Sequence, residues 1–175
     1  MHLSTVTTKT IRTFVLVSLC FGGLVLSPVF AQLPSVALRD INGKTVDTSK
    51  LNNNGKPFII TFFASWCKPC LRELKAIHEV YPDWQDETGV KVVAVSIDEA
   101  QNSARVKPMA DSSGWEFEVL LDPNSDFKRA LGVNLIPAAF VVDRNGKIVL
   151  SRTGYTDGSE KHLIDEVRKL IAEKK

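Results

Sequence analysis

The chain has 175 residues, of which 44% are hydrophobic and 24% are charged. This length and composition fit one globular domain with a short extra segment and exclude a disordered or fibrous protein. The formal net charge of +2 comes from Lys9 and Arg12, because residues 32–175 hold 20 basic and 20 acidic side chains. Residues 32–175 thus have no excess of positive charge with which to bind a phosphate backbone, so nucleic acid is excluded as an expected partner.

Residues 1–31 have the pattern of a signal peptide. Two basic residues come first, Phe14 to Leu26 is apolar, and Ser27 to Ala31 supplies a helix break and small residues before a cut ahead of Gln32. The alternative is an uncleaved membrane anchor, in which the apolar stretch extends over 11–30 to reach the roughly 20 residues of a span. We therefore expect an exported protein whose folded domain occupies residues 32–175.

The elements after the leader begin with a predicted β-hairpin. Val36 to Leu38 and Thr45-Val46 flank Asn42-Gly43, which is a strong hairpin turn signal. A polar loop follows, and residues 58–63 are then a short run of branched and aromatic apolar side chains typical of a buried strand.

A helix is predicted from Lys68 to about Trp84, with Pro82 causing a kink or an early stop. Its apolar residues recur at helical spacing and share one face: Leu71, Leu74, Ile77, Val80 and Tyr81. Gly89 closes this region, and residues 90–97 form the next predicted strand.

The second half continues the alternation of strands and helices, after a polar stretch with weak helical spacing at 98–113. The predicted elements are a strand at 116–121, a helix at 122–132, strands at 138–142 and 147–152 joined by an Asn145-Gly146 turn, and a helix at 159–173 capped by Ser159. Alternation predicts parallel strands and the hairpins add antiparallel ones. The expected fold class is α/β, with a central mixed β-sheet flanked by helices.

Cys67 and Cys70 are the cysteines left after the leader, and they lie where the first buried strand turns into a helix. The N–H groups and positive dipole end of a helix N-terminus favour a thiolate, which is the nucleophile in disulfide exchange. We therefore expect Cys67 to attack and Cys70, about one turn further on, to resolve the mixed disulfide. Lys68 adds positive charge, and Pro69 suits a first-turn position.

Metal binding is the weaker interpretation of this pair. A structural zinc site needs four ligands, and with the leader removed, only His78 and His162 could join the two cysteines. A structural role for a disulfide is also unfavoured, because a bond that closes a gap of only two residues would constrain the unfolded chain very little. We expect a redox-active disulfide, no metal and no other cofactor.

Two separate stretches resemble a known family. Phe62 to Cys70 is similar to the active-site strand and turn of thioredoxins, and Ile136-Pro137-Ala138 is similar to their cis-proline loop. With the export signal, the hairpin and the segment 121–123, residues 34–173 resemble the TlpA/ResA-like thiol–disulfide oxidoreductases of the bacterial cell envelope. The resemblance implies a thioredoxin-like fold with an N-terminal β-hairpin.

The resemblance also implies roles for residues outside the cysteine pair. Pro137 would follow a cis peptide bond and lie against Cys67. The backbone of Ile136 would pair with an incoming substrate strand, and Trp66 would form part of an apolar rim for partners. Thr61 stands where cytoplasmic thioredoxins have a buried Asp that assists proton transfer, so the proton acceptor for Cys70 is unassigned. Glu73 is expected to be a solvated helix residue, with a catalytic role as the weaker alternative.

The expected activity is the reduction of disulfides in exported proteins, such as apocytochrome c. Strong oxidants of this superfamily carry His before the second cysteine, whereas this chain has Pro69 there, as reducing thioredoxins do. A reductase in the periplasm or cell envelope needs a membrane electron donor, because that compartment is oxidising. We expect a monomer.

Two other functions stay open. A peroxiredoxin-type thiol peroxidase has a Thr three residues before its reactive cysteine, where this chain has Ala64. A copper-carrying binding module spaces its cysteines by three residues and adds a distal His, whereas the gap here is two.

Overall fold

The structure is a computed structural model that describes residues 32–173. The expected signal peptide at residues 1–31, and its alternative as a membrane anchor, lie outside the described residues. Among the helices of residues 32–173, none is both long and apolar enough to cross a membrane.

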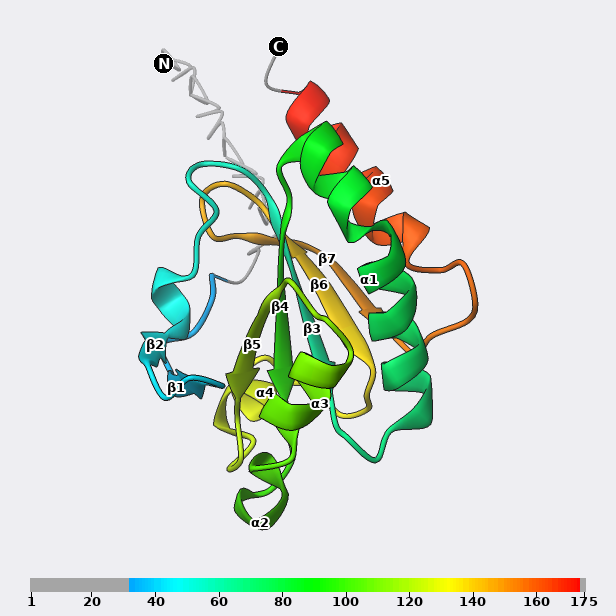
Figure 1. Ribbon diagram of the computed structural model, residues 1–175. Helices are drawn as coiled ribbons and strands as arrows, with labels where there is room; N and C mark the ends of the chain where they lie inside the picture. Colours follow the sequence, from blue (N-terminus) through cyan, green and yellow to red (C-terminus); the bar gives the residue numbers. More distant parts are fainter. Residues whose placement is uncertain (1–31, 174–175) are drawn as a thin grey trace, which may run out of the picture.

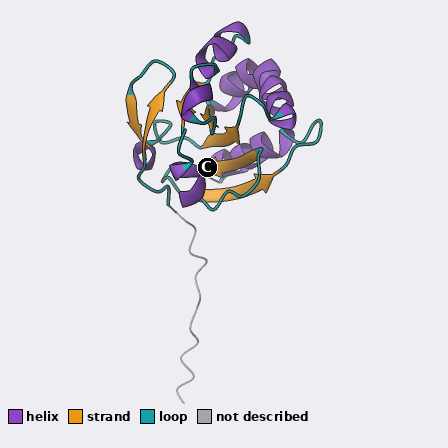
Figure 2. Ribbon diagram, turned by 90° about the horizontal axis from the view of Figure 1, so that it is seen from below, coloured by secondary structure: helices purple, strands orange, loops and turns teal. Residues whose placement is uncertain are grey.

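Seven strands form one sheet in the order β2-β1-β5-β4-β3-β6-β7 (Figure 1). They are β1 (Ala37–Asp40), β2 (Thr45–Asp47), β3 (Phe58–Phe63), β4 (Lys91–Ser96), β5 (Glu118–Leu121), β6 (Ala138–Val142) and β7 (Ile148–Thr153). The pairs β3–β4 and β4–β5 are parallel, and the other neighbouring pairs are antiparallel. The mixed sheet and the hairpin of β1 and β2, which stands at one side in Figures 1 and 2, are as predicted.

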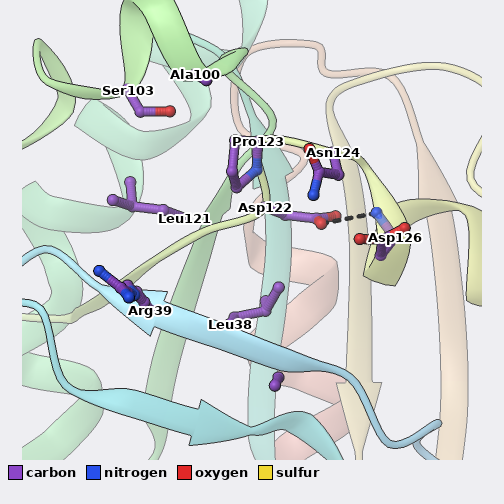
Figure 3. Close-up of a pocket in the computed structure, with 10 residues that line it drawn as sticks. Leu38, Arg39, Ala100, Ser103, Leu121, Asp122, Pro123, Asn124 and Asp126 are labelled. Atoms are coloured by element: carbon purple, nitrogen blue, oxygen red, sulfur yellow. Dashed lines mark hydrogen bonds between the residues drawn. The ribbon is translucent and has the colours of Figure 1, made fainter.

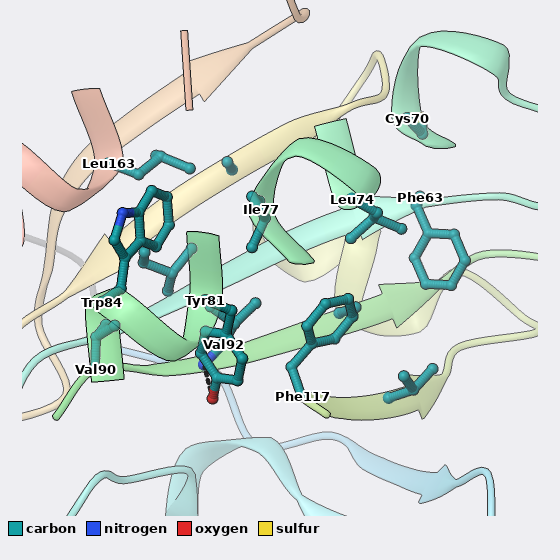
Figure 4. Close-up of a cluster of buried hydrophobic side chains, with 14 of the residues drawn as sticks. Phe63, Cys70, Leu74, Ile77, Tyr81, Trp84, Val90, Val92, Phe117 and Leu163 are labelled. Atoms are coloured by element: carbon teal, nitrogen blue, oxygen red, sulfur yellow. Dashed lines mark hydrogen bonds between the residues drawn. The ribbon is translucent and has the colours of Figure 1, made fainter. Parts of the chain in front are cut away.

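The central strand β3 is buried along its whole length because both faces of the sheet are covered. Ile59 and Phe63 belong to one apolar cluster, and Phe58, Ile60 and Phe62 belong to the other, as the two-residue period of a strand requires. The first cluster, shown in Figure 4, packs under the helices α1 (Lys68–Thr88), α3 (Val106–Ser112) and α5 (Lys161–Ala172). The second packs under α4 (Asp126–Ala130) and the hairpin.

Helix α1 is longer than predicted. It continues past Pro82, which is exposed, and ends at Thr88. Gly89 then adopts a left-handed conformation with φ of 66°, and its N–H donates to the carbonyl of Gln85 at 2.7 Å. The early stop predicted at Pro82 is wrong because the buried face continues through Trp84 to Thr88 and holds the last turn against the sheet.

Two helix starts also differ from the prediction. The helix expected over 122–132 shortens to α4, because Asp122 precedes it as a side-chain acceptor for the N–H groups of Asp126 and Lys128. The last helix begins at Lys161 with Glu160 at the cap position, so the cap predicted at Ser159 is wrong. The Ser159 hydroxyl instead accepts from the N–H of Thr156 at 3.2 Å.

Different segments of the chain lie at the two ends of the sheet. Phe62 pairs with Ala138 at one end, where β3 runs into Cys67 and the loop before β6 arrives; we call this end the cysteine pole. At the opposite end, the turn between β6 and β7 reaches Lys147, which forms an isolated bridge with Gln32. In Figure 1 the last turn of α5 also lies at that opposite end.

Candidate active site

Cys67 and Cys70 are joined by a disulfide at the start of α1. Cys67 is the N-cap residue, and its sulfur accepts the N–H of Cys70 at 3.3 Å. Pro69 lies in the first helical turn, where its missing N–H costs no hydrogen bond. Cys67 is 6% exposed and Cys70 is fully buried, so Cys67 is the more accessible residue of the pair.

The loop before β6 brings a second predicted feature to the cysteine pole. The Ile136–Pro137 peptide bond is cis, as predicted. Because Phe62 pairs with Ala138, Pro137 stands beside the end of β3 that leads into the cysteine turn. The Pro137 carbonyl accepts from the N–H of Gly154 at 2.8 Å, which ties the loop to the end of β7.

Large exposed apolar side chains of the described residues occur at Trp66 and Leu135, which are 65% and 70% exposed. Trp66 directly precedes Cys67, and Leu135 lies two residues before the cis proline. Both therefore flank the disulfide at the cysteine pole, together with exposed Lys68. Trp66 was expected on such a rim. Leu135 was missed, although its place beside Ile136 and Pro137 could have indicated it.

Glu73 corrects a prediction: it is 1% exposed rather than solvated. The hydroxyl of Thr61 donates to one carboxylate oxygen of Glu73 at 2.9 Å, and the guanidinium of Arg152 pairs with the other. A second guanidinium nitrogen of Arg152 donates to the hydroxyl of Ser159. Burial raises the pKa of Glu73 above its usual value, and Arg152 and Thr61 lower it by a smaller amount.

The register of α1 explains why Glu73 is inside. It lies three residues after Cys70 and one before Leu74, on the face that also buries Ile77. That spacing could have been read from the sequence. The partners could not, because Thr61 comes from β3 and Arg152 from β7. Thr61, which stands where thioredoxins have an Asp, thus donates to a carboxylate from the helix.

Comparison with known proteins agrees with this geometry. A model of the AhpC/TSA family matches residues 29–151. The chain belongs to the AhpC/TSA family. The ResA thiol–disulfide oxidoreductase of Bacillus thuringiensis (strain Al Hakam) is 31% identical over 67% of this chain and 65% of its own length. The ResA of Geobacillus thermodenitrificans (strain NG80-2) is 30% identical over 77% of this chain and 76% of its own length.

A solved structure supports the thioredoxin-like fold of this AhpC/TSA chain. An uncharacterized thioredoxin-like protein from Porphyromonas gingivalis is 67% identical, with a TM-score of 0.73 over 82% of this chain and 94% of that one. The chain spans about two thirds of the length of the Bacillus relative.

This AhpC/TSA chain offers no metal centre in the part that the structure describes, since no three His, Cys, Asp or Glu side chains gather there. His78 is half-buried on α1, and its Nδ1 has no hydrogen-bond partner. His162 is exposed on α5. The two histidines are therefore not brought to the cysteines.

A hollow of about 360 Å³ lies away from the disulfide, between β1 and the segment that leads into α4 (Figure 3). Leu38, Arg39, Leu121 and Pro123 line it. Its buried acid, Asp122, is already used by two N–H groups of α4. The buried carboxylate in the lining of this hollow is therefore already engaged in holding the start of α4.

Proposed function

We propose that this protein is a thiol–disulfide oxidoreductase that exchanges electrons between its Cys67–Cys70 pair and disulfides of other proteins. The observation that carries the proposal is the disulfide at the N-terminus of α1, beside the cis proline loop, with Cys67 slightly exposed and Cys70 fully buried. The names of the ResA relatives agree with it.

In the proposed reaction the reduced protein starts with Cys67 as a thiolate, favoured by its position at the helix N-terminus. Cys67 attacks one sulfur of the client disulfide, and the other client sulfur leaves as a thiolate that takes a proton. Cys70 loses its proton and attacks the Cys67 sulfur, which releases the second client thiol. Two electrons pass to the client, and the Cys67–Cys70 disulfide remains.

Glu73 is proposed as the proton acceptor for Cys70. It shares the inner face of α1 with Cys70, and its pKa is raised by burial, which makes its carboxylate a better base than a solvated one. Glu73→Gln should slow the release of the client by about 100-fold. Glu79→Gln, an exposed carboxylate on the same helix, is the matched control.

Clients are proposed to bind at the cysteine pole. An extended client segment would pair with the backbone of Ile136, and its apolar side chains would rest on Trp66 and Leu135. The proposed clients are disulfide-bearing exported proteins such as apocytochrome c, bound by a monomer in the periplasm or cell envelope. A membrane electron donor would reduce the protein again. Pro69 before the second cysteine supports the reducing direction.

The activity is tested by trapping and by equilibrium with glutathione. Cys70→Ser should hold clients in a mixed disulfide at Cys67, and Cys67→Ser should trap none. A reduction potential near about −120 mV, which is that of a strong oxidant, would reverse the proposed direction. Rapid turnover of hydrogen peroxide without a protein client would indicate a peroxidase, and tight Cu(I) binding that needs His162 would indicate a copper carrier.

A further inference from the structure

Asp98 is a buried carboxylate that the proposed reaction does not use. It follows β4, is 1% exposed, and takes part in none of the ion pairs found within residues 32–173. A buried carboxylate without a cation is costly unless hydrogen bonds satisfy its oxygens. The hydrogen-bond partners of Asp98 therefore show which part of the chain this side chain fixes in place.

Asp98 holds Ser65, in the turn that leads to the cysteines. One carboxylate oxygen accepts the main-chain N–H of Ser65 at 2.8 Å, and the other accepts its hydroxyl at 2.6 Å. The hydroxyl of Ser96 adds a third hydrogen bond at 2.8 Å. We call Ser65, Ser96 and Asp98 the Asp98 clamp. The side chain of Asp98, which follows β4, therefore accepts both polar hydrogens of Ser65, which follows β3.

The clamp itself is fixed to the sheet. The N–H of Asp98 donates to the hydroxyl of Ser96 at 3.1 Å, and its carbonyl accepts the hydroxyl of Ser103 at 2.9 Å. The N–H of Ile97 donates to the carbonyl of Phe63 at 2.9 Å, which continues the pairing of β3 and β4 up to the clamp. Ser65 is thus attached to a rigid neighbour.

The segment that the clamp holds is the one that presents the reactive groups. The N–H of Cys67 donates to the carbonyl of Ala64 at 3.0 Å and closes a four-residue turn around Ser65 and Trp66. Trp66 has little packing of its own, since most of its surface is exposed. In the oxidised protein the disulfide also ties Cys67 to α1. Reduction removes that tie, whereas the clamp contains no sulfur and persists.

We propose that Asp98 is a positioning residue that holds the turn of Ser65, Trp66 and Cys67 in its docking geometry when the Cys67–Cys70 bond is open. The proposal rests on the proposed thiol–disulfide exchange. It does not depend on which client is reduced or on the direction of electron flow.

The proposal has a consequence for the redox equilibrium. Reduction adds two electrons and two protons to the Cys67–Cys70 bond, and the resulting dithiol form depends on the clamp more than the disulfide form does. Asp98→Asn keeps one acceptor oxygen for the N–H of Ser65, but it removes the negative charge and replaces the oxygen that accepts the Ser65 hydroxyl by a donor, so the hydrogen bonds that remain are weaker. The variant should therefore disfavour the reduced form.

The experiment measures the equilibrium of each variant with glutathione. Asp98→Asn should lower the equilibrium constant for reduction about tenfold, which is a potential about 30 mV more negative. Ser65→Ala keeps the main-chain hydrogen bond and should lower it about threefold, or about 14 mV. Ser65→Thr keeps the hydroxyl and should restore most of the wild-type value.

Asp122→Asn is the matched control. Asp122 is also 1% exposed, and its oxygens accept N–H groups of Asp126 and Lys128 at 2.8 and 2.9 Å; the first of these bonds is drawn in Figure 3. It holds α4 rather than the cysteine turn. Asp122→Asn should lower the stability of both redox forms equally and leave the potential unchanged.

A second measurement separates the clamp from the proposed function. With the protein reduced by a phosphine, the amide hydrogen of Ser65 should exchange faster in Asp98→Asn than in Asp122→Asn, whether or not any client is reduced. Equal potentials and equal Ser65 exchange in these two variants would overturn the proposal. If Asp98→Asn does not fold, an unchanged potential in Ser65→Ala would overturn it. A wild-type protein that reduces no protein disulfide would instead contradict the proposed function.

Discussion

At the scale of single residues, Glu73 shows how the site is made from several elements. Its two carboxylate oxygens meet Thr61 from β3 and Arg152 from β7, so one helix residue connects the central strand β3 with the edge strand β7. A buried ion pair adds little net stability, because desolvation offsets the attraction between the charges. We propose that Glu73 lies inside the fold because it accepts the proton of Cys70.

The raised pKa of Glu73 predicts a specific dependence of stability on pH. A carboxyl group with a raised pKa in the folded state contributes stability below its ordinary pKa of 4.5, and that contribution is lost as pH rises through the folded-state pKa. Glu73→Gln removes this titration. The difference in unfolding free energy between wild type and Glu73→Gln should therefore be larger at pH 4 than at pH 8. A tenfold difference in proton affinity between the folded and unfolded states corresponds to about 1.4 kcal/mol.

Urea unfolding of both oxidised proteins across this pH range measures that difference, since the contributions of the other titrating groups are shared by the two proteins and cancel. A difference that stays constant or grows with pH would contradict the raised pKa.

Leu135 predicts an effect on client binding. Leu135→Ser removes apolar contact surface at the cysteine pole without touching a sulfur, so kcat/KM for a protein disulfide should fall about tenfold, mainly through KM. The smaller substrate oxidised glutathione covers less of this surface and should be affected much less. Steady-state rates with both substrates test this; equal losses would show that Leu135 acts on the cysteines and not on the client.

The predictions from the sequence agree best with the structure where a feature depends on a single segment of the chain. The strand, turn and helix around Cys67 carry their own local signals, so the cysteine pair could be placed in advance, whereas the cis proline was implied only by the resemblance to thioredoxins. The burial of Glu73 could have been read from the register of α1, but the hydrogen-bond partners of Glu73 and Asp98 could not, because they come from other elements of the fold. Thr61 and Ser65 supply those partners, and neither carries a local pattern that indicates one.

At the scale of elements, helix α1 illustrates how packing overrides local propensity. Pro82 lacks the N–H that would bond to the carbonyl of His78, and the sequence therefore predicted an interruption. The buried residues Tyr81 and Trp84 on either side hold the helix against the sheet instead. The short α4 is the opposite case, because a side chain, Asp122, satisfies N–H groups that a longer helix would have bonded internally.

Pro82→Ala should therefore stabilise the protein. The substitution restores one main-chain donor in an exposed part of α1 and removes the crowding of the ring, for a gain of about 1–3 kcal/mol in unfolding free energy. Thermal and urea unfolding of the oxidised protein measure the gain. Asp83→Ala, exposed on the same turn, is the control and should change stability by less than about 0.5 kcal/mol. An unchanged or lower stability of Pro82→Ala would show that the helix needs the proline ring.

At the scale of the whole molecule, alternation along β3 divides the interior into two apolar clusters that hold helices on one face and α4 with the hairpin on the other. The fold class and the succession of strands and helices follow from that alternation and from turn signals such as Asn42-Gly43. The contact of the hairpin with β5 is different, because Arg39 pairs with Leu121 across a gap of many residues that no local pattern specifies.

Export makes a prediction for the whole chain. If residues 1–31 act as a cleaved signal peptide, the protein recovered from the cell envelope should begin at Gln32, and its mass should match residues 32–175. Mass spectrometry of the purified protein and cell fractionation measure this. Recovery of the full 175-residue chain from membranes would support the anchor instead.

The bridge between Gln32 and Lys147 places the start of the folded unit at the end of the sheet opposite the cysteine pole. A tether joined ahead of Gln32 therefore attaches to the end of the molecule that is opposite the disulfide, and the cysteine pole points away from the attachment point. Chains fixed by this end to a bead or an electrode would all turn the cysteine pole, with exposed Trp66, toward the solution. Fixing the protein through the turn that contains Ser65 would hide this pole.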